Sequence, residues 1–315
     1  AGVVVNIPKK TKNLTWHFNA PMVHDFTWAA DKNYVHDVVK GPNDVDLHFF
    51  YKNNNPKTAE NWKKLEPVMV KVMDLYNQKI GDYPYKQYSF IQGGDGGMEY
   101  AMCTLMLGNG TFEGILGTAT HELGHAWFQH VLASNESKHP WMDEGFTTYV
   151  EDMVLNEIAV KKEDNPFKGN YAAYYKLVES GKEQPQTTHG DRYDENRPYS
   201  ISSYVKGSIF LSQLAYVIGQ DNLDKTVKKY YQDFKFKHPT PNDIKRTAER
   251  VSGANLDWYL VDWTQTLNTI DYGINEVKEN GDKTTVILER IGRMPMPIDL
   301  TVEYTDGSKE SFYIP

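Results

Sequence analysis

Hydrophobic residues recur at helical spacing through the middle of the chain. Thr58–Gln78 shows this spacing clearly, and Pro67 within it is expected to kink or split the helix. Thr240-Pro241 is typical of a helix start, and Gly253 of a helix stop. The centre of the chain is therefore predicted to be mostly helical, with loops at 133–139 and 181–200. Further helices are expected at about 113–131, 143–159, 171–180, 203–218, 222–234, 241–251 and 255–266.

Alternating apolar and polar residues, typical of β-strands, flank the helical centre. Asn280-Gly281 and Asp306-Gly307 are hairpin-turn signals near the end of the chain. Neither end carries enough strands to bury the face of its own sheet, so we expect the chain to be a piece of a longer protein. The expected strands are Gly2–Ile7, Leu14–Phe18, Val45–Tyr51, Tyr88–Ile91, Met98–Leu107, Lys283–Glu289, Ile298–Tyr304 and Ser308–Ile314.

The composition narrows the class of protein. The chain has 315 residues, of which 40% are hydrophobic and 24% charged, and its length favours about two domains. No stretch reaches the roughly 18 unbroken apolar residues of a membrane span. With 34 basic and 42 acidic residues, nucleic acid is not expected as the main partner. The single cysteine, Cys103, excludes a disulfide within this chain and a zinc site built from cysteines.

The most informative motif is His121-Glu122-Leu123-Gly124-His125, an H-E-x-x-H on an expected helix. Four residues is just over one helical turn, so both imidazoles point to one side, where they can bind one tetrahedral zinc. Glu122 lies on the flank of the same face and can reach a water on the metal without occupying a coordination position. The alternative interpretation is an amphipathic helix with histidines on its surface.

A third ligand is expected from the next helix. Glu144, in Trp141-Met142-Asp143-Glu144-Gly145, follows His125 after 18 intervening residues and opens a helical stretch just beyond Pro140. Two histidines and one glutamate form a known catalytic zinc set with an open fourth position. Glu144 could instead be an ordinary acid in a first helical turn. Glu151 lies seven residues further on the same face and could orient a ligating imidazole, or could simply be a solvated acid.

The zinc motifs occur together with two others. Gly96-Gly97-Met98-Glu99-Tyr100 lies upstream, and Tyr204-Val205-Lys206-Gly207 lies downstream. In this order, the motifs resemble those of the aminopeptidase N family of gluzincins. The resemblance implies an α+β fold, with a thermolysin-like zincin domain at 51–270 that is mostly helical with a small mixed sheet. It also implies one Zn²⁺ per chain and partial β domains on either side, with 1–50 the end of an N-terminal β domain and 271–315 the start of a β-sandwich-like domain.

The same resemblance implies roles for single residues. Glu99, supported by Gly96, Gly97 and Met98, would bind the free α-amino group of a peptide. Tyr100 stands where the family has asparagine, which puts the usual geometry of this corner in doubt. Tyr204 would stabilise the oxyanion, with Tyr199 nearby as the fallback.

The expected function is a zinc-dependent aminopeptidase in which Glu122 is the general base. Its partners would be peptides with free N-termini. Alternatives are another gluzincin peptidase (glycyl aminopeptidase-like, or an endopeptidase), a different reaction such as epoxide hydrolysis, or a non-catalytic binding module. His130, His139 and His189 lack ligand spacing and are expected at the surface. The preferred N-terminal residue, the localisation and the oligomeric state are not encoded in any motif we find.

Overall fold

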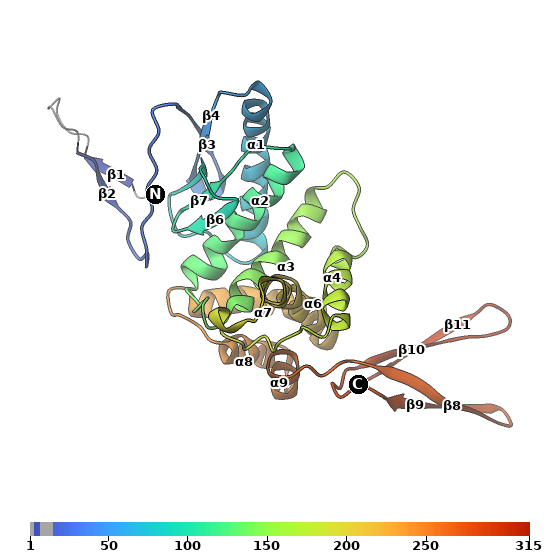
Figure 1. Ribbon diagram of the computed structural model, residues 1–315. Helices are drawn as coiled ribbons and strands as arrows, with labels where there is room; N and C mark the ends of the chain where they lie inside the picture. The colour runs from blue at the N-terminus through green and yellow to red at the C-terminus, as the bar shows by residue number, and fades with distance from the viewer. Residues whose placement is uncertain (1–2, 7–14) are drawn as a thin grey trace.

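A mixed five-stranded sheet packs against the first helices of the molecule (Figure 1). The computed structural model describes residues 3–6 and 15–315. The strand order is β3-β4-β5-β7-β6, with β4, β5 and β7 parallel and the two edge strands antiparallel to their neighbours. The strands are β3 (Tyr34–Lys40), β4 (Asp46–Lys52), β5 (Gln87–Gln92), β6 (Gly97–Tyr100) and β7 (Cys103–Met106).

The edge of this sheet differs from the prediction. A single strand was expected at Met98–Leu107, but β6 and β7 form an antiparallel hairpin in which Tyr100 pairs with Cys103. The chain reverses at Ala101 and Met102, and Met102 has a positive φ of 62°. This turn contains no glycine, asparagine or proline, so the sequence carried no turn signal. The hairpin places β6, and with it Glu99, at the edge of the sheet.

The first helix is α1 (Pro56–Lys79), which is continuous through Pro67. Of the two outcomes expected at Pro67, a kink or a split, the split is therefore wrong. The side chain of Asn55 caps the helix by accepting hydrogen bonds from the backbone N–H groups of Lys57 and Thr58. One face of α1 is buried in the core, including Trp62, and this packing offsets the cost of proline in a helix interior.

The central and later helices follow the predicted pattern closely. The expected helix at 113–131 is α2 (Phe112–His125) continued by a π-helical segment, η2 (Ala126–Val131). The expected loop at 181–200 contains two short helical pieces. The remaining helices are η1 (Pro42–Asp44), α3 (Pro140–Ile158), α4 (Lys168–Glu179), η3 (Gly190–Arg192), α5 (Asn196–Ser200), η4 (Ile201–Val205), α6 (Lys206–Ile218), α7 (Gln220–Phe234), α8 (Pro241–Ser252) and α9 (Asp257–Gln265).

Two features of α8 match their sequence signals. Thr240 and Asp243 form a capping box at its start. Gly253 ends it in the left-handed conformation, with φ 76°. The structure as a whole combines many helices with one mixed sheet and several small two-stranded sheets, which is the α+β fold that the sequence predicted. Among the described residues, no helix has both the length and the apolar character to cross a membrane.

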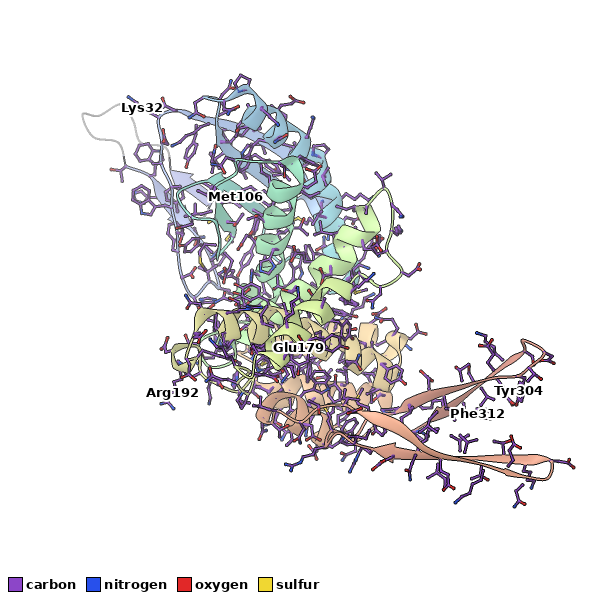
Figure 2. The ribbon with its side chains drawn as sticks, turned by 45° about the vertical axis from the view of Figure 1, so that its right-hand side comes forward. Lys32, Met106, Glu179, Arg192, Tyr304 and Phe312 are labelled. Atoms are coloured by element: carbon purple, nitrogen blue, oxygen red, sulfur yellow. The ribbon has the colours of Figure 1, made fainter. Side chains whose placement is uncertain are left out.

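Hairpins extend from both ends of the helical part (Figure 1). The strands are β1 (Val3–Asn6), β2 (His17–Asn19), β8 (Tyr272–Asn280), β9 (Lys283–Arg290), β10 (Ile298–Glu303) and β11 (Lys309–Ile314). The two hairpins near the end of the chain, β8–β9 and β10–β11, turn at Gly281 and Gly307. These glycines have φ values of 63° and 82°, as the turn signals predicted. Figure 2 shows Tyr304 and Phe312 on the last hairpin, formed by β10 and β11, and both side chains are exposed. Within the predicted early strands, Gly2, Ile7 and Leu14 lie outside the described residues.

Candidate metal centre and active site

Three side chains from two helices converge on one point. His121 and His125, one turn apart on α2, have their Nε2 atoms 3.1 Å from each other. Each of these nitrogens is 3.2 Å from Oε2 of Glu144 on α3. A tetrahedral zinc with bonds of about 2.0 Å has ligand–ligand edges of about 3.3 Å. This ligand triangle (Nε2 of His121, Nε2 of His125 and Oε2 of Glu144) therefore fits a zinc ion and leaves a fourth position for water or substrate.

A carboxylate holds the other nitrogen of each imidazole. Oε2 of Glu151 lies 2.8 Å from Nδ1 of His121, and Oδ1 of Asp143 lies 2.5 Å from Nδ1 of His125. With Nδ1–H donating to a carboxylate, each Nε2 is free to present its lone pair to a metal. The contact of Glu151 was predicted from the sequence, whereas that of Asp143, which is almost fully buried, was not. The only sequence signal for a role of Asp143 was its position directly before Glu144 at the start of α3.

The charge state of Glu144 suits a metal ligand. Burial alone would raise the pKa of this carboxyl group. The positive charge that His125 and His121 can carry, together with their hydrogen bonds, outweighs burial and holds the pKa well below its usual range. Glu144 therefore presents an ionised carboxylate to the triangle.

Glu122 lies beside the triangle without joining it. Its Oε2 atom is buried and has no hydrogen-bond partner among the described residues. Burial raises the pKa of Glu122 to about 7, against the opposing effect of His125 and His121. A Cβ atom placed on Gly97 would lie 2.4 Å from Oε1 of Glu122, so the glycine of β6 leaves the space that this carboxylate occupies. An unpaired buried carboxylate next to a ligand triangle is suited to accept a proton from a bound water.

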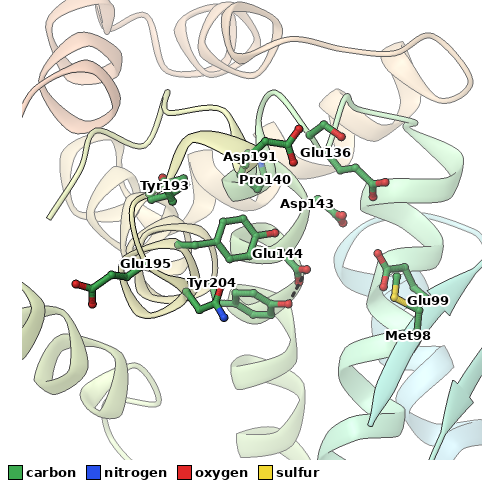
Figure 3. Close-up of a pocket in the computed structure, with 14 residues that line it drawn as sticks. Met98, Glu99, Glu136, Pro140, Asp143, Glu144, Asp191, Tyr193, Glu195 and Tyr204 are labelled. Carbon is green, nitrogen blue, oxygen red and sulfur yellow. Dashed lines mark hydrogen bonds between the residues drawn. The ribbon is translucent and has the colours of Figure 1, made fainter. Parts of the chain in front are cut away.

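Tyr204 reaches the triangle from the π-helical segment η4. Its hydroxyl group donates a hydrogen bond to Oε1 of Glu144 at 2.7 Å (Figure 3). Its ring stacks on the imidazole of His121 with 5.6 Å between ring centres. Burial, followed by the charge of Glu144, raises the pKa of Tyr204 far above its usual value. The side chain therefore stays a neutral phenol that can donate a hydrogen bond.

A contact between two glycines brings α3 and α6 together at this point. A Cβ atom on Gly145 would lie 2.4 Å from Cα of Gly207, and one on Gly207 would lie 2.7 Å from Cα of Gly145. Gly145 directly follows Glu144 of the ligand triangle on α3, and Gly207 directly follows Lys206 on α6. Nζ of Lys206 forms a buried ion pair of 2.7 Å with Glu183, which anchors the start of α6 next to η4. The close approach of the backbones explains how Tyr204 reaches Glu144.

Glu99 faces the same site from the edge of the sheet. It is 8% exposed, and burial raises its pKa to about 8. It lines a cavity of about 490 Å³ together with Met98, Asp143, Glu144, Tyr199 and Tyr204. The wall of this cavity also carries Glu136, Asp191 and Glu195, and contains no lysine or arginine among the described residues (Figure 3). Gly96 and Gly97 border an adjoining depression with His121, Glu122 and Tyr204.

The structure thus brings most of the sequence-predicted residues into one region. His121, His125 and Glu144 meet at one point. Glu151 and Tyr204 hydrogen-bond to these residues, and Glu122 lines the same depression as His121. Glu99 and Met98 lie across the cavity. Tyr100 follows Glu99 on β6 and pairs through its backbone with Cys103. The surface prediction for His130 is wrong, because η2 continues the line of α2 into the core and leaves this side chain only 5% exposed.

The fold and the ligand triangle together define a candidate mononuclear zinc centre in an α+β domain. The sequence model of the Peptidase family M1 domain matches residues 67–263. The chain belongs to peptidase family M1, and the resemblance to the aminopeptidase N family is confirmed.

Individual relatives agree with this family. Leucine aminopeptidase 2 of Chaetomium globosum is 26% identical over 208 residues, which is 61% of this chain and 33% of that protein. Aminopeptidase B of Mus musculus is 28% identical over 159 residues, which is 44% of this chain and 24% of that protein. The chain therefore spans a third or less of the length of these two curated relatives.

Solved structures resemble the fold. A mutant of an M1 zinc metallopeptidase from Deinococcus radiodurans has a TM-score of 0.64 at 17% identity, covering 84% of this chain and 60% of that chain. Aminopeptidase A of Legionella pneumophila, in complex with aspartic acid, also has a TM-score of 0.64, at 14% identity and covering 90% of this chain and 35% of that chain. At these identities the likeness establishes the fold alone.

Proposed function

We propose that this chain forms the catalytic part of a zinc-dependent aminopeptidase, which removes residues from the free N-termini of peptides. The observation that carries the proposal is the ligand triangle, with atoms 3.1 to 3.2 Å apart and the unpaired carboxylate of Glu122 beside it. Membership of family M1 supports zinc as the occupant, bound by His121, His125 and Glu144. When bound, zinc would act as a Lewis acid toward the scissile carbonyl and the attacking water.

The chain's own residues supply the proton transfers. Glu122 accepts the proton of the attacking water at Oε2 and delivers it to the nitrogen of the leaving amine. The raised pKa of Glu122, about 7, is suited to both steps near neutral pH. Asp143 and Glu151 hold the two imidazoles in the orientation that leaves Nε2 free for the metal.

Tyr204 stabilises the developing negative charge on the carbonyl oxygen. In the substrate-free arrangement its hydroxyl group donates to Glu144, so it must exchange this partner for the oxyanion. A single donor of this kind is typically worth about 10²–10³ in kcat. Tyr199 lines the same cavity and is the fallback for this role.

Glu99 sets the register of the substrate. A carboxylate in this buried position pairs with the α-ammonium group of the first residue and lowers the cost of its own ionisation. Gly96, Gly97 and Met98 form the adjoining wall. Because the ammonium group is fixed at Glu99, only the first peptide bond reaches the metal.

The domain organisation belongs to the same proposal. Residues 51–270 would be the zinc peptidase domain, with 1–50 ending an N-terminal β domain and 271–315 starting a β-sandwich-like domain. The hairpins after residue 271, with exposed side chains such as Phe312, support the second boundary. The first boundary falls within β4, which pairs with β5 in the five-stranded sheet, so this sheet extends across residue 50.

The test compares peptides with free and acetylated N-termini. The zinc-loaded chain should cleave the free peptides from the N-terminus and leave the acetylated ones intact. Glu99→Gln should raise KM for free peptides more than it lowers kcat, because it removes a charge that binds the substrate. Equal cleavage of free and acetylated peptides would contradict the anchor role of Glu99 and indicate an endopeptidase instead.

A further inference from the structure

His130 is a buried histidine whose ring nitrogens have no hydrogen-bond partner in the described part of the chain. It lies on η2, five residues after the proposed zinc ligand His125, and is 5% exposed. A neutral imidazole always has one N–H donor and one lone pair, so this ring has hydrogen-bonding or ligand capacity that its surroundings do not use. Burial, reinforced by His24 and His125, lowers the pKa of His130 to about 3, which keeps the lone pair available.

Two further ligand-type side chains face this ring from the N-terminal segment. One ligand atom from each of His24, Asp25 and His130 lies within 4.8 Å of the other two. The rings of His24 and His130 are 5.4 Å apart between centres and nearly parallel, at 18°. The side chains of His24 and Asp25 are 36% and 43% exposed, so the group is open to solvent on one side.

We propose that His24, Asp25 and His130 bind a divalent transition-metal ion, with zinc the natural candidate, at a second site separate from the ligand triangle. Two imidazole nitrogens and one carboxylate oxygen are a common donor set for such ions. The donors must close from as much as 4.8 Å to about 3.3 Å for tetrahedral binding. His24 and Asp25 lie in a stretch without helix or strand. Moving these two residues by this distance costs less free energy than shifting a packed helix or strand.

The position of the proposed site indicates that a bound metal would stabilise the turn between β6 and β7. Oδ1 of Asp25 accepts a hydrogen bond of 3.3 Å from the backbone N–H of Ala101, in the turn between β6 and β7. Glu99 lies two residues before Ala101 on the same hairpin. A metal held by Asp25, His24 and His130 would therefore fasten the N-terminal segment and η2 to the turn next to Glu99. This second site does not depend on the proposed peptidase activity.

Equilibrium zinc binding to the whole metal-free chain tests the proposal. We expect two zinc equivalents in the wild type, one in His24→Ala and one in His130→Gln. His17→Ala, which changes an exposed histidine in the same N-terminal segment, should keep two. His121→Ala should lose the other equivalent, so failure at the ligand triangle and failure at the second site give different patterns.

Amide hydrogen exchange provides a readout that does not count metal ions. Filling the second site should slow exchange at Ala101 and in residues 20–26 of the wild type, but not of His24→Ala. A single equivalent in the wild type would overturn the proposal, as would two equivalents that persist in His24→Ala. In either case, the contact between His24 and His130 is packing only. Because His24 is exposed, this variant decides the matter even if His130→Gln does not fold.

Discussion

At the scale of single residues, neighbouring carboxylates take different tasks because their partners differ. Glu144 is held ionised by two histidines, whereas burial raises the pKa of Glu122 to about 7 and that of Glu99 to about 8. The first state suits a metal ligand, the second a base that must also release its proton, and the third a group that waits for a cation. One region of the molecule thus contains three acids whose charge states suit the three proposed roles.

Asp143 provides a prediction at this scale. Asp143→Asn keeps the shape of the side chain but can turn its amide N–H₂ toward Nδ1 of His125, which favours the wrong tautomer of the imidazole. We expect zinc affinity to fall about 10- to 100-fold, as is typical when the partner of a ligating histidine is changed. Competition with a chromogenic chelator measures this loss. Unchanged affinity would show that Asp143 does not orient His125.

The residue scale also shows what the sequence could predict. The i, i+4 spacing of His121 and His125 is a local property of a helix, so their convergence could be predicted, and Glu144 followed from its position at the start of the next helix. Asp143 could not be assigned, because adjacent helical residues point about 100° apart and only the packing of α3 on α2 decides which histidine it meets. The same holds for His130, since its burial depends on where η2 enters the core.

At the scale of elements, β6 and α2 fit together through Gly97. Gly97→Ala would place a Cβ atom 2.4 Å from Oε1 of Glu122 and 2.8 Å from Cγ2 of Thr118. We expect the displaced carboxylate to lower kcat about 100-fold, which is the order of loss for a misplacement of about 1 Å. Gly94→Ala is the matched control, because a Cβ atom there meets nothing within 4 Å. Steady-state kinetics of the two variants with equal zinc content decide the point, and equal rates would contradict it.

The crossing of α3 and α6 gives a second prediction for an element. Gly145→Ala would force a Cβ atom against the backbone of Gly207, where no side chain can move away. We expect a loss of about 1–3 kcal/mol in the free energy of unfolding, typical of overpacking. Gly169→Ala, in α4 with open space around its Cβ position, should instead be neutral or stabilising by up to about 1 kcal/mol. Denaturant unfolding compares the two, and equal stability would refute the importance of the glycine contact.

The sequence did not predict the elements whose boundaries are set by packing against residues far away in the chain. The turn between β6 and β7 lacks turn residues, and β3 and β8 lack a strong alternating pattern. The π-helical segments η2 and η4 continue ordinary helical periodicity, so they could not be distinguished from α-helix. Amphipathic helices such as α7 and α8 were predicted well, because their buried stripe is encoded locally.

At the scale of the whole molecule, the site lies where the sheet edge, the ligand-bearing helices and the η4 segment meet. The sheet supplies Glu99, α2 and α3 supply the ligand triangle, and η4 supplies Tyr204. Each of these parts is fixed by a different packing contact, namely the β6–β7 hairpin, the α2–α3 interface and the contact of Gly145 with Gly207. The account therefore predicts one assembled centre rather than separate binding groups.

The measurement that tests this account most directly follows peptide hydrolysis as a chelator removes zinc and as zinc is added back. Cleavage of peptides with free N-termini should vanish with the metal and return with it, while acetylated peptides stay intact. Glu122→Gln should bind the same amount of zinc yet lose about 10²–10⁴ in rate, which separates the base from the metal. Full activity in the metal-free chain, or near-wild-type kcat in Glu122→Gln, would contradict the central claim.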